Sequence, residues 1–345
     1  MSPTPTTRFK NPRAKYNFQG RTSSIAGVGS YVPSRILTNA DLEKMVNTTD
    51  EWITTRTGIK ERHIAAKDEY TSDLATKAAL KALERANVKP EEIDLIIVAT
   101  ITPDMPFPST AALVQRNIGA FRAAAFDMEA ACSGFIYALE IAQHFIMSRT
   151  FDTVLVIGAE KLSSIVDWED RNTCVLFGDG AGAAVLRNRP GAHGLLTAVM
   201  GADGRKADLL FMEGGGSRCP ATPDSVAARR HYLRMEGKET FKNAVQAMQT
   251  AAQEALRRCE IDITRIKCVI PHQANRRIVD AVGERLGAKP EQLFVNLDKY
   301  GNTSAASVAI ALDEAVASGR IQRGDLILMV VFGAGLTWGA AVIEW

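Results

Sequence analysis

Residues 123–147 read AAAFDMEAACSGFIYALEIAQHFIM and join two apolar runs through a cysteine that stands among small residues. The first run, 123–128, predicts a short buried strand, and the second, 133–147, has so little polar face that it predicts a core helix. Cys132 lies at the joint. Because a helix N-terminus stabilises an anion, we expect this thiol to ionise more easily than usual and to act as a nucleophile. An inert buried cysteine is the alternative.

Size and composition are those of an ordinary globular protein. The chain has 345 residues, a length that allows two domains or one large double domain. Of these residues 46% are hydrophobic and 23% are charged. A net charge of +2 gives no case for nucleic-acid binding, and no apolar run reaches the ~18 residues of a membrane span. The five cysteines are scattered without a CxxC pair, which argues against a disulfide framework or a zinc site. They favour a reducing compartment, the cytoplasm.

Residues 1–21 are polar, basic and free of acidic residues, with no apolar segment that could serve as a secretory signal. This composition predicts a disordered N-terminal extension. An organelle transit peptide, which is also basic and poor in acidic residues, is the alternative.

From residue 22 onward the pattern alternates between strand and helix. In the first half we expect strands at 24–32, 94–101, 123–128, 153–158 and 181–186. Helices are expected at 39–46, 72–88, 109–118 and 133–147, with Asn39 and Ser72 as the caps of the first two. In the second half, helices are expected at 238–258, 276–286 and 304–317, and strands at 267–271, 294–297, 326–331 and 339–344.

Two pairs of similar short segments indicate an internal duplication. GAAVL at 182–186 is matched by GAAVI at 339–343, and the segment 126–142 is paralleled by FVNLDKYGNTSAASVAIAL at 294–312. They predict two α/β halves, 22–190 and 191–345, packed face to face as a five-layer αβαβα sandwich. Chance similarity between such short segments is the alternative.

Two polar residues of the second half are candidates to join the cysteine. His272 directly follows the predicted strand 267–271, and Asn302 lies in the turn 300–303. Open α/β sheets build their sites at the carboxyl ends of strands, so we expect both to converge on Cys132. A papain-like protease also has Cys, His and Asn in this order, but its local cysteine signature is missing. The glycines at 178, 180 and 182 precede a strand and break the dinucleotide-loop spacing, which excludes that motif.

The residues around these three positions resemble a known family. Cys132 in AACSGF, His272 in PHQAN and Asn302 in YGNTSAAS resemble the Cys-His-Asn triad of the thiolase superfamily. More narrowly, the chain resembles the β-ketoacyl-acyl carrier protein synthase III family from about residue 23 to 345. The resemblance includes the segments DEWI at 50–53, RTGIKERH at 56–63, FGDGAG at 177–182, FGAG at 332–335 and TWG at 337–339.

This resemblance implies a thiolase-like fold and a decarboxylative condensation that starts fatty acid biosynthesis. An acyl-CoA primer, acetyl-CoA or similar, would acylate Cys132, and malonyl-acyl carrier protein would then condense with it to give 3-oxoacyl-acyl carrier protein, CoA and CO₂. The backbone N–H groups of Cys132 and Ala334 would bind the oxyanion, although residue 334 is often glycine in the family. His272 and Asn302 would donate to the malonyl thioester oxygen. Because the thioester is the electron sink, no metal or redox cofactor is expected.

The same resemblance implies the substrate contacts. Trp52 would stack on the CoA adenine with Arg171 beside it, Arg56 would meet the CoA phosphates, and Asn275 the pantetheine. Phe107 would reach the acyl pocket of the second subunit in a homodimer. A basic patch would dock the acidic carrier protein, formed by Lys242, Arg276 and Arg277. Solvated surface charges are the alternative for these three.

Residues 201–233 are rich in Gly, Arg and Pro and predict a long irregular segment that serves as a lid or entrance wall. Two other functions stay open. One is a related Cys-His-Asn condensing enzyme of polyketide or other secondary metabolism. The other, from a different class, is a non-catalytic acyl-binding subunit. The sequence leaves the chain length and branching of the primer open.

Overall fold

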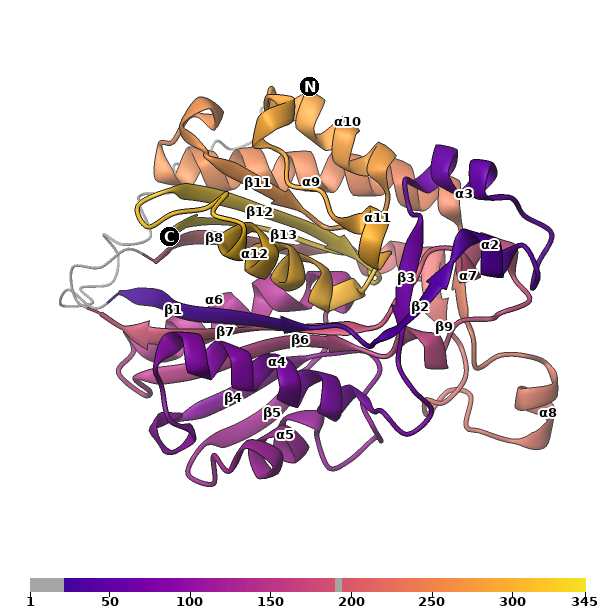
Figure 1. The fold of residues 1–345 in the computed structure, drawn as a ribbon, viewed down its shortest axis with the longest axis horizontal. Helices are drawn as coiled ribbons and strands as arrows, with labels where there is room; N and C mark the ends of the chain where they lie inside the picture. Colours follow the sequence, from indigo (N-terminus) through magenta and orange to yellow (C-terminus); the bar gives the residue numbers. More distant parts are fainter. Residues whose placement is uncertain (1–21, 190–193) are drawn as a thin grey trace, which may run out of the picture.

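The computed structural model describes residues 22–189 and 194–345. Two β-sheets lie face to face with helices between them and on both outer faces, which gives five αβαβα layers (Figure 1). The predicted fold class is therefore confirmed. The predictions for residues 1–21 lie outside the described residues, and the division into halves at residue 190 stays a prediction.

The first sheet takes its strands from the N-terminal part of the chain, in the order β1-β7-β6-β4-β5. Strand β4 pairs in parallel with β5 and β6, whereas β7 is antiparallel to both β6 and β1. The strands are β1 (Ser23–Tyr31), β4 (Leu95–Ala99), β5 (Ala124–Met128), β6 (Thr153–Glu160) and β7 (Gly180–Asn188).

The second sheet has the order β11-β12-β13-β8. Strands β11 and β12 are parallel, and the other neighbours are antiparallel. Its members are β8 (Leu195–Ala202), β11 (Cys268–Pro271), β12 (Leu326–Gly333) and β13 (Thr337–Glu344). No strand was predicted at the position of β8, so this strand was missed.

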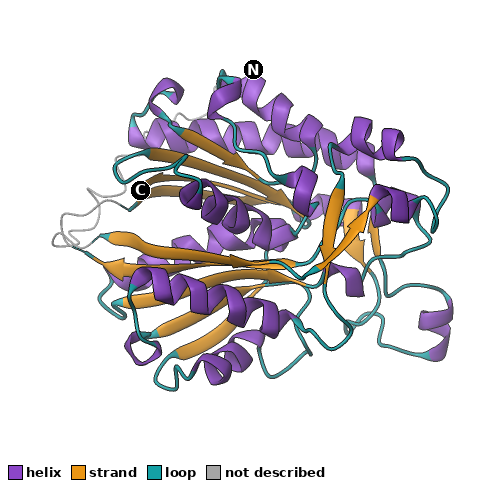
Figure 2. Ribbon diagram, viewed as in Figure 1, coloured by secondary structure: helices purple, strands orange, loops and turns teal. Residues whose placement is uncertain are grey.

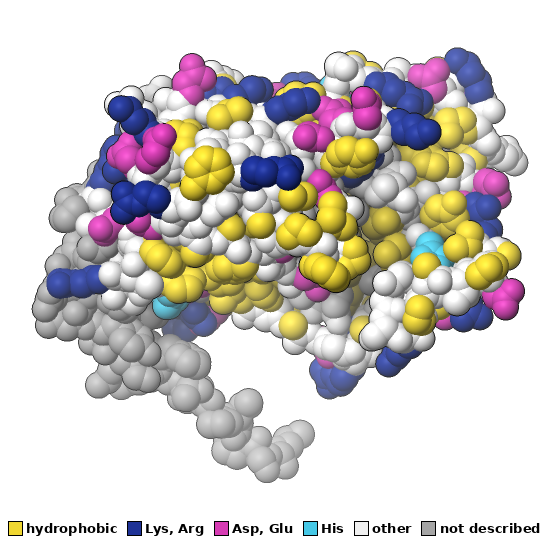
Figure 3. Space-filling model, turned by 90° about the horizontal axis from the view of Figure 1, so that it is seen from below, with side chains coloured by type: hydrophobic (Ala, Val, Ile, Leu, Met, Phe, Trp, Pro, Cys, Tyr) yellow, Lys and Arg dark blue, Asp and Glu magenta, His cyan; other side chains and the backbone are white. Residues whose placement is uncertain are grey.

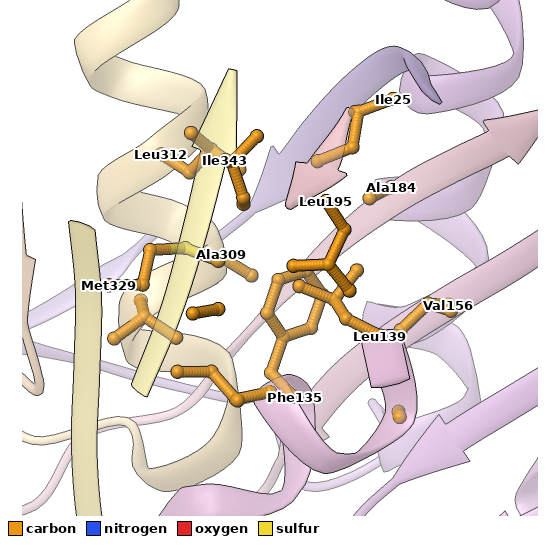
Figure 4. Packing of buried hydrophobic residues seen from close by; sticks show 14 of the residues in the cluster. Ile25, Phe135, Leu139, Val156, Ala184, Leu195, Ala309, Leu312, Met329 and Ile343 are labelled. Atoms are coloured by element: carbon orange, nitrogen blue, oxygen red, sulfur yellow. The ribbon is translucent and has the colours of Figure 1, made fainter. Parts of the chain in front are cut away.

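Helices α6 (Gly134–Met147) and α12 (Ser307–Ala317) form the central layer. Their side chains pack with residues from both sheets in one apolar cluster, which includes Phe135 and Leu139 of α6 and Ala309 and Leu312 of α12 (Figure 4). This position between two sheets explains why α6 is apolar almost all round.

The outer helices complete the sandwich, as the colouring by secondary structure shows (Figure 2). Helices α4 (Thr71–Ala86) and α5 (Thr110–Ile118) cover the first sheet, and α9 (Gly237–Cys259) and α10 (Arg276–Leu286) cover the second. No helix of the described residues has the length and apolar character needed to cross a bilayer.

A short 3₁₀ turn precedes each central helix, and the two turns share their local geometry. They are η2 (Ala131–Ser133) before α6 and η7 (Ser304–Ala306) before α12. Each begins with a residue at positive φ, 46° at Ala131 and 49° at Ser304. In both, the N–H of that residue donates to the side chain two positions earlier, Glu129 in one and Asn302 in the other.

Two predicted caps are wrong because the side chains are engaged elsewhere. Helix α2 (Asn39–Leu42) is capped by Thr38, while the Asn39 amide is buried and donates to the Ile59 carbonyl at 2.8 Å. Helix α4 begins at Thr71, and the Ser72 hydroxyl donates to Asp104 at 2.6 Å.

Two predicted strands also need correction. Strand β5 forms at the expected position but is only half-buried, because it is the edge of its sheet and has one neighbour. Residues 294–297 do not form a strand. Only the Phe294 N–H bonds to the Val269 carbonyl, after which the Asn296 N–H turns to the Gln273 side chain and α11 (Leu297–Tyr300) begins.

The remaining short elements gather at the end of the molecule drawn on the right in Figure 1. They are β2 (Arg35–Thr38), α3 (Asp50–Thr57), β3 (Glu61–Ile64), α7 (Arg171–Cys174), β9 (Leu210–Met212), α8 (Pro223–Ala227) and β10 (Leu233–Met235). Strands β9 and β10 pair with each other, so the segment 201–233, expected to be irregular, is partly ordered.

Candidate active site

Cys132, His272 and Asn302 line one cavity of about 620 Å³. Cys132 comes from η2, His272 follows β11, and Asn302 precedes η7. Each side chain is almost fully enclosed, with exposed fractions of 6%, 4% and 7%. The structure thus brings together the three residues that the sequence singled out.

Asn302 is held in a single orientation. Its backbone N–H donates to the Leu176 carbonyl at 2.8 Å, and its carbonyl accepts from the Gly178 N–H at 3.0 Å. Its side-chain Oδ1 accepts from the Ser304 N–H at 2.8 Å. With the amide oxygen used in this way, the Nδ2 group is the part that can donate to a substrate oxygen.

His272 is held equally firmly. Its N–H donates to the Val330 carbonyl at 2.8 Å, and its Nδ1 lies 2.6 Å from the Ser307 hydroxyl. Burial lowers the pKa of His272 to about 4, so the imidazole is neutral at physiological pH. When the Ser307 hydroxyl donates to Nδ1, Nε2 carries the proton and is a neutral hydrogen-bond donor.

The expectation that Cys132 ionises easily is wrong for the resting protein. Burial raises the pKa of Cys132 to about 12, and the negative charges of Glu160 and Glu129 act in the same direction. Desolvation of the thiolate therefore outweighs any benefit from the start of α6. The nucleophile rests as a thiol and must lose its proton before it attacks.

The backbone beside Cys132 is suited to bind an oxyanion. A Cβ on Gly333 would lie 2.7 Å from the Cys132 backbone nitrogen, so only glycine allows the chain to pass there. The next residue, Ala334, has a backbone N–H that makes no hydrogen bond within the described residues. The N–H groups of Cys132 and Ala334 thus lie on neighbouring segments of the same site.

A second cavity of about 560 Å³ also includes Cys132 in its wall. Most of its lining is apolar, contributed by Ile101, Pro106, Met128, Leu162, Ile165, Phe177, Leu210, Phe211, Met212 and Leu233. The thiol therefore stands between a larger, mixed cavity and an apolar pocket. This arrangement suits a substrate whose reacting carbonyl joins a long polar group to an apolar chain.

The predicted CoA contacts fall mostly at the first cavity. Trp52, Arg56 and Asn275 line it, whereas Arg171 does not. The guanidinium carbons of Arg56 and Arg171 lie 4.6 and 4.8 Å from the Trp52 ring centroid. Asn275 caps α10 and donates through Nδ2 to the Arg56 carbonyl at 3.1 Å, which fixes α3 against α10.

The predicted basic residues lie beside the cavity. Arg276 and Arg277 are exposed in the first turn of α10, which contains no acidic residue. Cations are unfavourable at a helix N-terminus, and Arg276 already pairs with Asp280 at 2.8 Å, so it is mainly the place of Arg277 that favours an external anionic partner. Arg277 lines the cavity and its guanidinium carbon lies 5.4 Å from the Phe241 ring, next to the exposed Lys242 on α9.

Phe107 is 83% exposed and lies beside Pro106, which lines the apolar pocket. The contact with a second subunit stays a prediction. Within the described residues, no group of three or more His, Cys, Asp or Glu side chains could hold a metal ion.

Sequence reasoning missed three polar side chains at the site: Ser304, Ser307 and Glu160. Both serines belong to the turn and helix that follow Asn302, but no local pattern indicates that Ser307 meets His272. Glu160 is the last residue of β6, two positions beyond the predicted strand. The rule that sites lie at strand ends could have indicated it.

Comparison with known proteins matches residues 126–204 to the family described as 3-oxoacyl-[acyl-carrier-protein (ACP)] synthase III, and residues 256–345 to its C-terminal part. The chain is 58% identical over 323 residues to a β-ketoacyl-[acyl-carrier-protein] synthase III from Caldanaerobacter subterraneus, covering 94% of this chain and 98% of that relative.

Solved structures give the same picture. A 3-oxoacyl-[acyl-carrier-protein] synthase III from Aquifex aeolicus is 52% identical with a TM-score of 0.87, covering 94% of this chain and 100% of the other. The priming β-ketosynthase of the R1128 polyketide pathway is 37% identical with a TM-score of 0.87, covering 98% of both chains.

Proposed function

The chain belongs to the β-ketoacyl-[acyl-carrier-protein] synthase III family, and we propose that it condenses an acyl-CoA primer with malonyl-acyl carrier protein. The products are 3-oxoacyl-acyl carrier protein, CoA and CO₂, so the reaction initiates fatty acid biosynthesis. One observation carries the proposal: Cys132, His272 and Asn302 share a cavity, and the thiol also borders an apolar pocket.

The first half-reaction transfers the acyl group. The sulfur of Cys132 attacks the thioester carbonyl of the acyl-CoA, and CoA leaves as the acyl-enzyme forms. The N–H groups of Cys132 and Ala334 bind the oxyanion of the tetrahedral intermediate, and loss of one such donor typically costs ~100- to 1,000-fold in rate. The acyl chain lies in the apolar pocket.

The second half-reaction forms the carbon–carbon bond. The malonyl thioester oxygen accepts hydrogen bonds from His272 Nε2–H and Asn302 Nδ2–H, which stabilise the enolate as CO₂ leaves. Both donors are neutral, and they are held by Ser307 and by the Ser304 N–H. The enolate attacks the acyl-Cys132 and releases the thiolate. The thioester accepts the electron pair, so this route requires no metal or redox cofactor.

The CoA contacts follow from the position of Trp52 at the cavity. Adenine stacks on the Trp52 ring, and Arg171, whose guanidinium carbon lies 4.8 Å from the ring centroid and which is outside the cavity wall, flanks it. Arg56 then faces the phosphates, and Asn275 lies along the pantetheine. The acidic carrier protein docks on Lys242, Arg276 and Arg277, where cations already occupy the positive end of α10.

A homodimer completes the proposal. Strand β5 is a half-buried edge strand with free backbone groups along one side, a feature that proteins usually cover. Hydrophobic side chains gather in the middle of the face that carries α4 and α5 (Figure 3). Phe107 is exposed and can reach a second copy. All five cysteines lie in the described residues and are in the thiol form, which supports a reducing compartment, the cytoplasm.

Acyl transfer tests the proposal directly. Radiolabelled acetyl-CoA should leave one acyl group per chain on Cys132, and Cys132→Ser should carry none. Addition of malonyl-acyl carrier protein should convert the label into 3-oxoacyl-acyl carrier protein, and a series of acyl-CoA primers defines the preferred chain. Label on another cysteine, or labelled enzyme that never condenses, contradicts the proposal. The second outcome supports a non-catalytic acyl-binding subunit.

The similarity to a priming β-ketosynthase favours one second candidate, a condensing enzyme that starts polyketide synthesis. The chemistry at Cys132 is the same in both, so the carrier protein discriminates. Faster turnover with a polyketide-type than with a fatty-acid-type acyl carrier protein, at equal primer concentration, would favour this candidate.

A further inference from the structure

Glu160 is a fully buried acid beside the nucleophile to which the mechanism above gives no role. It has no exposed surface and, within the described residues, no salt bridge. Its carboxylate accepts from the Thr102 hydroxyl at 2.6 Å, the Thr100 hydroxyl at 3.2 Å and the Ile101 N–H at 3.2 Å. A buried carboxylate without a cation is costly, so its presence calls for an explanation.

Ser304 lies close to both groups, because it lines the same apolar pocket as Cys132 and as Thr100 and Ile101, which donate to the Glu160 carboxylate. Its hydroxyl is buried and makes no hydrogen bond in the described part of the chain, and its proximity lowers the pKa of both the Cys132 thiol and the Glu160 carboxyl. A hydroxyl donates one proton and accepts another by rotating, so this buried group can serve either neighbour.

The chemistry at Cys132 needs such a partner. A thiol whose pKa is about 12 must give up its proton before attack. His272 is a weak base because burial lowers its pKa to about 4, and its Nδ1 is engaged by Ser307. Burial raises the pKa of Glu160 to about 7, which makes its carboxylate the stronger base of the two near neutrality.

We propose that Ser304 relays the thiol proton of Cys132 to Glu160 when the sulfur attacks the acyl-CoA. The Cys132 S–H bond breaks as its proton passes to Ser304 Oγ, and the Ser304 O–H proton passes to the Glu160 carboxylate. The sulfur then forms its bond to the acyl carbon, the carbon–sulfur bond to CoA breaks, and CoA thiolate takes a proton from solvent. The inference rests on the proposed function and adds a proton path to it.

The path runs backward in the second half-reaction. Attack of the enolate on the acyl group releases Cys132 as a thiolate. The carboxylic acid of Glu160 returns a proton to Ser304, which passes its own to the sulfur. The thiolate and the carboxylate repel each other, as the effect of Glu160 on the Cys132 pKa shows, so the pair favours states that share one proton.

Two other charged groups lie nearby. The Glu129 carboxylate, just before η2, accepts from the Ala131 N–H at 3.0 Å, lines the same pocket as Cys132 and also raises the pKa of that thiol. The ammonium of Lys161, the residue after Glu160, donates to the carbonyl oxygens of Ala66 and Glu69 at 2.8 and 2.6 Å. Lys161 is a cation and cannot take up the thiol proton, and Glu129 is exposed to solvent, whereas Glu160 is fully buried.

The rate of Cys132 acylation by acetyl-CoA, measured across pH, tests the relay. In the unchanged protein the rate should rise with pH through the ionisation of Glu160, near pH 7, and then level off. In Glu160→Gln this rise should vanish and acylation at pH 7.5 should slow by about 100-fold or more, the usual contribution of a general base. Release of CO₂ from malonyl-acyl carrier protein, which needs no thiol, should persist and shows that the site is folded.

Electrostatics alone predicts the opposite sign. Removing the Glu160 charge makes the thiolate easier to form, so a relay-free site would acylate faster in Glu160→Gln. Ser304→Ala is the second variant, and its backbone is tolerated because Ala131 has the same positive φ in the equivalent turn. It should slow acylation like Glu160→Gln, and the double variant should be little slower than either.

The outcomes separate the two proposals. If Glu160→Gln acylates as fast as the unchanged protein or faster, Glu160 is not the acceptor. If Ser304→Ala keeps the full rate, the proton does not pass through Ser304. Absence of any acyl group on Cys132 in the unchanged protein would instead contradict the proposed function itself.

Discussion

Replacement of Asn302 should separate the two half-reactions. Asn302→Ala removes the Nδ2 group that we propose donates to the malonyl thioester oxygen, and loss of one such donor slows the step by ~100- to 1,000-fold. Acylation of Cys132 does not use this donor and should continue. Cys132→Ala should show the reverse, with no acyl-enzyme but continued CO₂ release, because the enolate can form and be protonated without an acyl partner.

The same substitution has a structural cost that must be distinguished from the chemical one. Asn302 Oδ1 accepts from the buried Ser304 N–H, and an unpaired buried N–H costs about 1–3 kcal/mol of folding free energy. Asn302→Asp is the matched control, because it keeps an acceptor for Ser304 but replaces the donor with a negative charge. It should lose decarboxylation as well, but its loss of stability comes from the buried carboxylate and not from an unpaired Ser304 N–H, so that loss should shrink as the pH falls and the carboxyl group takes up a proton.

The assays are release of CO₂ from malonyl-acyl carrier protein, acylation from acetyl-CoA and urea unfolding, run on each purified variant. We expect both Asn302 variants to acylate and to release CO₂ at least about 100-fold more slowly. The alanine variant should unfold at lower urea at every pH, whereas the aspartate variant should do so mainly near neutral pH, where its carboxyl group is charged. If Asn302→Ala decarboxylates at the unchanged rate, the Cys-His-Asn assignment must be abandoned.

Three further predictions concern docking, acid stability and packing. Lys242→Glu should raise KM for malonyl-acyl carrier protein but leave acylation from acetyl-CoA unchanged, and high salt should reduce the difference in KM between the variant and the unchanged protein. Equal losses in both reactions at every salt concentration would contradict the docking role. Since burial lowers the His272 pKa from 6.5 to about 4, its neutral form stabilises the fold fully above pH 6.5 and loses that contribution as pH falls toward 4. His272→Gln should thus lose less stability between pH 7 and 4 in urea unfolding, by up to about 3 kcal/mol, and an unchanged pH dependence would contradict this. A Cβ at Gly158 would overlap the Ala305 carbonyl in η7. Gly158→Ala should therefore lower the free energy of unfolding by roughly 1–3 kcal/mol and slow both half-reactions. Unchanged stability and rates would show that η7 can move freely.

The regular core of the fold could be predicted because its pattern is local. The all-apolar helix after Cys132 and the continuous run at 94–101 mark elements covered on both sides, and the structure places them there. Strand β5 looked equally buried, but its exposure depends on its place at the sheet edge, which no local pattern records. The caps failed for a similar reason, because Ser72 bonds to Asp104 from a distant segment.

The candidate site could be predicted in part. Cys132, His272 and Asn302 are chemically distinctive residues at expected strand ends, so residue type and position indicated them. Ser307 and Glu160 have roles set by contacts between separate elements, which become visible only when the chain is folded. The direction of the Cys132 pKa shift was missed because desolvation depends on every layer packed around the thiol.

The close approach of η7 to β6 at Gly158 has a consequence for how substrate preference can change. The reacting groups lie on η2, directly after β11 and just before η7, and an added methyl group is not tolerated at Gly158 or at Gly333, where other backbone segments approach closely. The outer wall of the apolar pocket comes instead from the small β9–β10 pair, through Leu210, Phe211 and Leu233. Side chains there can be exchanged without moving Cys132 or its partners. The preferred primer length and branching can therefore change through substitutions in one small sheet. The reacting residues keep their positions, and the substrates, carried on long flexible thioester arms, move to reach them.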